Sequence, residues 1–227
     1  MTTAEPALPV LPMERLVLWR HGRTEWNATG RFQGQLDPPL DAEGRSQAAR
    51  VAPELAADLP AGQTTVVSSD LSRAAETAAS LTAVLGVQLR LDPRLREHGM
   101  GLWEGLTRDE VAERFPDEYA DWVAGRDVSR RGGETRAEVA ERACAALDDL
   151  PMADVTVIVT HSATAMALCA ALLGLPQEPH VLGPLANCHW TELRSDSRWQ
   201  LRAHNAGPPG PVIPRLAPDE DVPDAEA

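Results

Sequence analysis

The chain has 227 residues, of which 43% are hydrophobic and 24% are charged, enough for one sizeable α/β domain. Its formal net charge of −13 argues against nucleic acid and anionic membranes, because both bind basic surfaces. No apolar run approaches the ~20 residues that span a bilayer, and the N-terminus lacks the basic and apolar pattern of a secretory signal. The three cysteines form no CxxC pair, so a disulfide framework or zinc knuckle is not expected. We therefore expect a cytoplasmic protein.

Both ends of the chain have the composition of disordered tails. Residues 1–12 contain prolines and no helical or strand pattern, and residues 207–227 combine prolines with an acidic run. Such segments bury too little apolar surface to offset the entropy lost on ordering. We predict a single folded unit over 13–206, with no internal repeat.

Strand and helix patterns alternate along this unit. In chain order they are a buried strand at 15–20, a helix at 41–59, a buried strand at 64–69, a helix at 70–85, a strand at 87–91, a helix at 135–150, a buried strand at 155–160, an Ala/Leu helix ending at Gly174, and a strand pair at 188–193 and 199–203. The alternation predicts an α/β fold with a mostly parallel sheet and helices on both faces.

Four sequence signals mark where the predicted helices begin and end. Asp41 and Asp70 are expected N-caps, and Gly86 is a favourable residue to end the second helix. Thr135 and Glu138 form a T-x-x-E capping box.

The residues that follow the three buried strands are the candidate site, because ligands bind beyond the carboxyl ends of parallel strands. The first strand runs into Arg20 and His21, the second leads to Arg73, and the third runs into His161. Two imidazoles and two guanidiniums beside helix N-termini describe an anion site that suits phosphate. A neutral imidazole can attack phosphorus directly, and the flanking arginines would oppose its protonation.

A departing alkoxide also needs a proton, which a carboxylic acid can supply. The glycine-rich stretch 95–105 brings two candidates towards the site, Glu97 and Glu104. The pattern alone does not choose between them.

At these residues the chain resembles the histidine phosphatase superfamily, also called the phosphoglycerate mutase-like family. The resemblance covers about residues 14–205. Its motifs, in the family's order and spacing, are Arg20-His21-Gly22-x-Thr24-x-x-Asn27, Phe32-Gln33-Gly34-x-x-Asp37-x-Pro39-Leu40, Ser68-Ser69-Asp70-Leu71-x-Arg73-Ala74-x-x-Thr77, Leu95-x-Glu97 leading to Gly101-x-Trp103-Glu104-Gly105, and Thr160-His161.

The resemblance implies a three-layer α/β/α sandwich and a phosphatase that needs no metal and no cofactor. It implies that His21 becomes phosphohistidine and that Glu97 is the proton donor. The implied phosphate-binding residues are Arg20, Asn27, Arg73 and His161. The implied substrate-binding residues are Thr24, Gln33, Gly34 and Ser162.

Within the family the chain is most similar to small bacterial phosphatases, which act on small phosphorylated metabolites. Two departures bear on the mutase alternative: Arg23 stands where the mutase branch usually has Glu, and Ser162 and Ala163 follow His161 where Gly is usual. A third alternative is a phosphate-ligand binder without turnover. The physiological phosphomonoester and the oligomeric state, a homodimer included, stay open. Arg126, Arg130 and Arg131 are candidate contacts for a second acidic group, with surface solvation an equal alternative.

Overall fold

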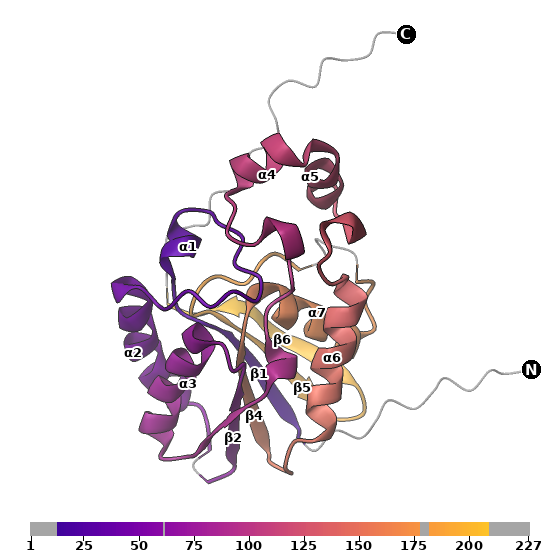
Figure 1. The fold of residues 1–227 in the computed structure, drawn as a ribbon. Coiled ribbons are helices and arrows are strands. Elements are labelled where there is room, and N and C mark those ends of the chain that lie inside the picture. The colour runs from indigo at the N-terminus through magenta and orange to yellow at the C-terminus, as the bar shows by residue number, and fades with distance from the viewer. Residues whose placement is uncertain (1–12, 61, 178–181, 209–227) are drawn as a thin grey trace, which may run out of the picture.

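The computed structural model describes residues 13–60, 62–177 and 182–208 (Figure 1). Its centre is one six-stranded sheet with the strand order β3-β2-β4-β1-β5-β6. The strands are β1 (Arg15–Arg20), β2 (Thr64–Ser68), β3 (Leu89–Leu91), β4 (Val155–Thr160), β5 (Trp190–Ser195) and β6 (Trp199–Ala206).

The sheet is mostly parallel, as the sequence predicts. Strands β3, β2, β4 and β1 run parallel, whereas β5 pairs antiparallel with β1 and β6 pairs antiparallel with β5. Arg20 of β1 stands opposite Thr160 of β4. The residue after each of them, His21 and His161, therefore leaves the sheet at the same edge.

Helices cover both faces of the sheet, which confirms the three-layer α/β/α expectation. In Figure 1, α2 and α3 lie on one side, and α6 and α7 lie on the other. The helices are α1 (Glu25–Ala28), α2 (Ala42–Ala56), α3 (Ser72–Leu85), α4 (Arg108–Arg114), α5 (Pro116–Val123), α6 (Arg136–Asp148) and α7 (Ser162–Leu173), with 3-10 turns at Pro93–Leu95, Gly101–Trp103 and Ser129–Arg131.

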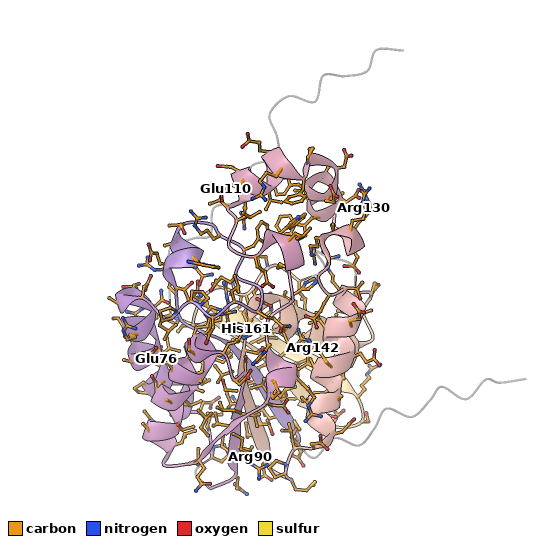
Figure 2. The ribbon with its side chains drawn as sticks, in the orientation of Figure 1. Glu76, Arg90, Glu110, Arg130, Arg142 and His161 are labelled. Atoms are coloured by element: carbon orange, nitrogen blue, oxygen red, sulfur yellow. The ribbon has the colours of Figure 1, made fainter. Side chains whose placement is uncertain are left out.

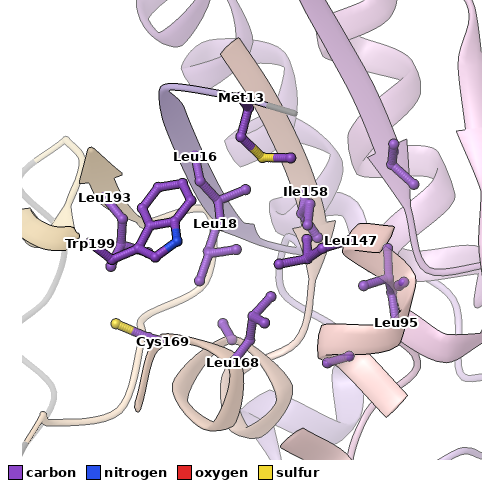
Figure 3. Packing of buried hydrophobic residues seen from close by; sticks show 14 of the residues in the cluster. Met13, Leu16, Leu18, Leu95, Leu147, Ile158, Leu168, Cys169, Leu193 and Trp199 are labelled. Carbon is purple, nitrogen blue, oxygen red and sulfur yellow. The ribbon is translucent and has the colours of Figure 1, made fainter. Parts of the chain in front are cut away.

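Two apolar cores hold the layers together, one on each face of the sheet. The alternation of side chains along β1 sends Leu16 and Leu18 into the core beneath α6 and α7, shown in Figure 3. The same alternation sends Val17 and Trp19 into the core beneath α2 and α3. Because β1 is buried on both faces, its sequence is a continuous apolar run.

Most of the predicted helix ends are confirmed. Asp41 caps α2 by accepting from the Gly44 N–H at 2.7 Å, and Thr135 and Glu138 form the capping box of α6. Gly86 ends α3 in the left-handed conformation, with φ of 69°. Gly174 ends α7 in the same conformation.

The prediction that Asp70 caps α3 is wrong. Asp70 instead receives two hydrogen bonds from the Arg96 guanidinium, at 2.7 and 2.6 Å. The cap comes from a distant loop: Oδ1 of Asp37 accepts from the N–H and the hydroxyl of Ser72, both at 2.8 Å. The bidentate ion pair with Arg96 is stronger than a helix cap, so Asp70 binds Arg96 instead. The helix begins at Ser72 rather than at 70.

Helices α4 and α5 form a cap, residues 104–133, above the carboxyl edge of the sheet (Figure 1). Its interior is a separate cluster centred on Trp103 and Val111, against which Phe32, Tyr119 and Trp122 pack. The sequence predicted no helix here.

The expected tails, 1–12 and 207–227, lie outside the described residues except for Gly207 and Pro208. Among the helices that the structure describes, none is long and apolar enough to cross a membrane.

Candidate active site

His21 sits directly beyond β1 and is 2% exposed. Its backbone N–H donates to the Thr160 carbonyl at 3.0 Å, which continues the strand pairing by one residue. Its Nδ1 lies 2.6 Å from the Gly22 carbonyl oxygen. A carbonyl only accepts, so Nδ1 carries the proton and the lone pair of the neutral ring is on Nε2.

His161 lies against His21, with ring centroids 5.0 Å apart and an interplanar angle of 61°. It is fully buried, and Figure 2 places it at the sheet edge that faces the cap. Its Nε2 is 3.0 Å from the Ser69 hydroxyl, and its Nδ1 has no partner among the described residues. When Ser69 donates to Nε2, the neutral ring has its N–H on Nδ1.

Both imidazoles are held in the neutral form. Burial lowers the pKa of His21 well below its ordinary value, and the charges of Arg73 and Arg20 lower it further. The pKa of His161 is lowered well below the ordinary value by burial and then by Arg73. Desolvation and nearby cations both disfavour the imidazolium, so an available lone pair is the resting state of His21.

Arg73, in the first turn of α3, is completely buried. Its guanidinium donates to the carbonyls of Leu36 at 2.7 Å and Gly34 at 2.9 Å. Burial lowers its pKa to about 10, which still leaves it charged at neutral pH. Its Nε has no partner among the described residues. The Gly34 backbone thus serves the site by holding Arg73.

Arg20 is half-buried at the end of β1 and donates to the Leu185 carbonyl at 2.6 Å. Burial lowers its pKa, and its Nε has no partner in the described part of the chain. The hydroxyl of Ser162 accepts from the Leu185 N–H at 3.1 Å. Ser162 therefore helps to fix the segment on which Arg20 rests.

Asn27 is oriented by three hydrogen bonds to one atom. Its Oδ1 accepts from the N–H and hydroxyl of Thr24, each at 3.1 Å, and from Nδ2 of Asn187 at 3.2 Å. With the oxygen so occupied, the amide presents its N–H groups elsewhere. The Thr24 hydroxyl also lies 3.0 Å from Oε1 of Gln33, so these two side chains belong to the same network.

The two candidate acids have different hydrogen-bond partners. Glu104 is engaged in fixing loops, since its Oε1 accepts from the backbone N–H groups of Met100 at 3.0 Å and Gln35 at 3.1 Å. Glu97 is placed by its own Oε1, which accepts from the N–H of His98 at 2.9 Å and of Thr164 at 3.2 Å. Its negative charge opposes the lowering of the pKa of Arg20 and of Arg73, and the charge of Glu104 does the same more weakly at Arg73.

Among the cap arginines, only Arg131 is buried. It stacks over the Trp103 ring at 5.2 Å, so it supports the cap's interior. Arg126 and Arg130 are exposed. They pair with Asp121 at 2.7 Å and Glu118 at 3.7 Å.

Sequence reasoning missed the partners that orient the site. Asn187 and Leu185 contact residues far away in the chain, and no local pattern marks them. Ser69 belongs to the motif that contains Arg73, but no role was assigned to it. Ser69 lies within a predicted strand, and Asn187 precedes one; only their place at the sheet edge could have drawn attention to them.

The chemistry that the pocket offers is that of an anion site. The His161 ring lies against the neutral His21 ring, and the charges of Arg73 and Arg20 act on both. In the described residues, no group of three His, Cys, Asp or Glu side chains is placed to hold a metal ion.

Comparisons with known proteins find a family and several relatives. The sequence profile of the histidine phosphatase superfamily (branch 1) matches residues 16–207. The chain is 37% identical to a glucosyl-3-phosphoglycerate phosphatase of Mycolicibacterium vanbaalenii, over 86% of this chain and 95% of that protein. It is 36% identical to a probable phosphoglycerate mutase of Escherichia fergusonii, over 82% and 88%. A solved mycobacterial glucosyl-3-phosphoglycerate phosphatase with VO3 superimposes with a TM-score of 0.76 at 37% identity, covering 86% of this chain and all of that one.

Proposed function

The chain belongs to the histidine phosphatase superfamily and is a phosphoric monoester hydrolase, and we propose that it passes the phosphoryl group of a small phosphomonoester through Nε2 of His21. The proposal assigns phosphate binding to Arg20, Asn27, Arg73 and His161, and proton transfer to Glu97.

One observation carries this assignment. Nε of Arg20, Nε of Arg73 and Nδ1 of His161 are buried nitrogens without a hydrogen-bond partner among the described residues. A buried donor left unsatisfied costs about 1–3 kcal/mol. A phosphoryl group has three acceptor oxygens and negative charge, so it satisfies these donors and balances the two guanidiniums.

The proposed reaction has two balanced steps. The lone pair on Nε2 of His21 forms the P–N bond while the ester P–O bond breaks, and Glu97 gives its proton to the departing oxygen. Water then attacks phosphorus while the Glu97 carboxylate takes the water's proton. The P–N bond breaks, inorganic phosphate leaves, and both residues return to their starting forms. Arg20 and Arg73 stabilise the charge on the transferring group.

For the substrate we propose a phosphorylated sugar acid of the glucosyl-3-phosphoglycerate type. Support comes from the relatives of that name, which match nearly their whole length. The chain also has relatives named as probable phosphoglycerate mutases. Arg23 stands at the position where a glutamate is usual in mutases, and this departure favours hydrolysis.

The test is hydrolysis of p-nitrophenyl phosphate and of a phosphorylated-metabolite panel in EDTA, by the wild type and His21→Ala. We expect wild-type turnover and ³²P labelling of the protein, with both lost in His21→Ala. His204→Ala is the matched control, because His204 bonds to Thr191 and Gly183, outside the pocket. Turnover that survives His21→Ala refutes the proposal. Primer-dependent conversion of 3-phosphoglycerate to 2-phosphoglycerate identifies a mutase instead.

A cytoplasmic location and a homodimeric state stay predictions. Fractionation and size-exclusion chromatography with light scattering test them.

A further inference from the structure

We propose that Arg142, on α6, is a positioning residue that holds the loop carrying Glu97 in the geometry needed for proton transfer. This inference rests on the proposed role of Glu97. Figure 2 labels Arg142 on α6, and every N–H of its guanidinium is bound to another protein group.

All five N–H donors of Arg142 are used, three of them by one short segment. Two donors of NH1 reach the carbonyls of Arg94 at 2.8 Å and Arg96 at 2.7 Å. One donor of NH2 reaches the carbonyl of Glu97 itself at 3.0 Å. Three carbonyls within four consecutive residues therefore converge on one rigid, planar group, which fixes the backbone leading into Glu97.

The remaining two donors bind Glu134. The Arg142 Nε lies 2.6 Å from Oε1 of Glu134, and NH2 lies 2.9 Å from Oε2. The same Oε2 accepts from the N–H of Gly99 at 2.7 Å. The Arg142–Glu134 pair thus binds the backbone on both sides of Glu97: Arg142 on the N-terminal side and Glu134, through Gly99, on the C-terminal side.

The pair is largely shielded from water, which makes it more than a surface contact. Its side chains are 18% and 24% exposed for Arg142 and Glu134. Although burial opposes ionisation of Glu134, the hydrogen bond from Arg142 holds its pKa below the ordinary value. Removing Arg142 leaves the Glu134 charge unpaired and takes one hydrogen bond from each of the three backbone carbonyls.

The same pair connects the acid to the phosphate pocket. Nε2 of Gln35 donates to Oε2 of Glu134 at 3.3 Å and to the Glu97 carbonyl at 3.4 Å. Gln35 stands between Gly34 and Leu36, whose carbonyls bind Arg73. Arg142 therefore ties the loop of the proposed acid to the loop that seats a phosphate-binding arginine.

A positioning role for an acid has a signature that general stabilisation lacks. An alkoxide leaving group must be protonated as it departs, whereas dinitrophenolate leaves without a proton. A displaced acid therefore slows alkyl phosphates selectively. The parameter kcat/KM is the right measure, because it covers steps up to the first phosphoryl transfer and not the later hydrolysis of phosphohistidine.

The experiment compares kcat/KM for 2,4-dinitrophenyl phosphate and for an alkyl phosphate in Arg142→Gln, Glu97→Gln and the double variant. We expect Arg142→Gln to lose about 10–100-fold on the alkyl ester and less than about threefold on the dinitrophenyl ester. If Arg142 acts through Glu97, the double variant is no slower on the alkyl ester than Glu97→Gln alone. Arg136→Gln is the matched control, because Arg136 lies on the same helix as Arg142. The substitution removes an ion pair with Asp127 and a hydrogen bond to the Gly125 carbonyl, and neither partner belongs to the loop that carries Glu97.

The outcomes separate the two proposals. An equal loss on both esters, or no loss, in folded Arg142→Gln overturns the positioning role. If Glu97→Gln itself shows no leaving-group selectivity, the role assigned to Glu97 fails first. If Arg142→Gln does not fold, as seen by circular dichroism, Glu134→Gln and Arg142→Lys decide the question. Selectivity for the alkyl ester in those variants supports the role, and its absence overturns it.

Discussion

The side-chain amide of Asn187 donates to Oδ1 of Asn27 across 3.2 Å, joining residues that are 160 positions apart in the chain. The same amide nitrogen donates to the His21 carbonyl at 3.1 Å. One side chain thus fixes both the orientation of the Asn27 amide and the backbone of the proposed nucleophile.

Replacing Asn187 by alanine should weaken catalysis while leaving the fold intact. The Asn27 amide loses one of the bonds that orient it, and a neutral hydrogen bond contributes about 1 kcal/mol. We expect kcat/KM for p-nitrophenyl phosphate to fall about fivefold to tenfold. Asn187→Asp should be worse, because it places an anion against the Asn27 oxygen. Unchanged kinetics in both variants would remove Asn187 from the site.

The depressed pKa values of His21 and His161 predict how stability depends on pH. Between the ordinary value of 6.5 and the lower folded values, the unfolded chain binds more protons than the folded chain. The stabilising contribution of the two neutral histidines is therefore fully present above pH 6.5. Below pH 6.5 the free energy of unfolding decreases, by at most ~1.4 kcal/mol per pH unit for each histidine. Urea unfolding at several pH values between 5 and 8 measures how steeply the free energy of unfolding changes with pH. His161→Gln should show a shallower slope, and an identical one contradicts the prediction.

The same pKa shifts predict which species is seen in solution. In NMR titrations of the ligand-free protein, we expect the His21 and His161 rings to remain neutral at pH 6, where an exposed histidine is largely protonated. Ring ¹⁵N shifts should report Nδ1 as the protonated nitrogen of His21, as the bond to the Gly22 carbonyl requires. A protonated Nε2 on neutral His21 would contradict the proposed point of attack.

A close backbone approach predicts that Gly44→Ala is damaging. Gly44, in the first turn of α2, packs against the backbone of Arg23, and an added Cβ would overlap it. Because this loop follows His21, the variant should lose about 1–3 kcal/mol of stability and part of its activity. Gly183→Ala is the control, since a Cβ there would meet no heavy atom within 4 Å among the described residues beyond its chain neighbours. Equal melting temperatures for the two variants would show that the close contact between Gly44 and the Arg23 backbone does not limit stability.

The three cysteines should be inert in the folded protein. Burial raises the pKa of Cys169 and of Cys188 to about 12, and burial also raises that of Cys144. Thiolates are the reactive form, so a disulfide reagent at pH 7.5 should leave phosphatase activity intact. All three thiols should react after unfolding in urea. Rapid loss of activity in the folded state would point to an accessible thiol near the site.

The sheet could be predicted because of how its strands are buried. Strands β1 and β4 are covered on both faces and therefore read as apolar runs. Strand β3 is an edge strand of three residues and has a weaker signal, which is why its expected start at 87 moved to Leu89. The short helices α4 and α5 were not predicted, although Thr107 and Glu110 form a T-x-x-E capping box at the start of α4. At seven and eight residues they are too short to show a clear apolar period, and the aromatic cluster of the cap stabilises them.

The residues of the candidate site could be placed together from the sequence only where the order and direction of the strands determine their positions. Parallel pairing of β1 with β4 brings His21 to His161, so strand ends alone suffice to place them together. The orienting contacts of Asn187, Ser69 and Arg142 depend on side chains meeting across the fold, which no local pattern records. The wrong cap at Asp70 has the same origin, since Arg96 competes for it from another loop.

The cap's aromatic cluster, Phe32, Trp103, Tyr119 and Trp122, is a core distinct from the two on the sheet. Substitutions inside it should therefore alter the cap without loosening the layers that seat His21. The separation is incomplete at Glu104, whose Oε1 binds the backbone of Met100 and Gln35 beneath the cap. An exchange of cap sequences between relatives should therefore keep Glu104, together with Phe32 and Trp103, against which the cap helices pack.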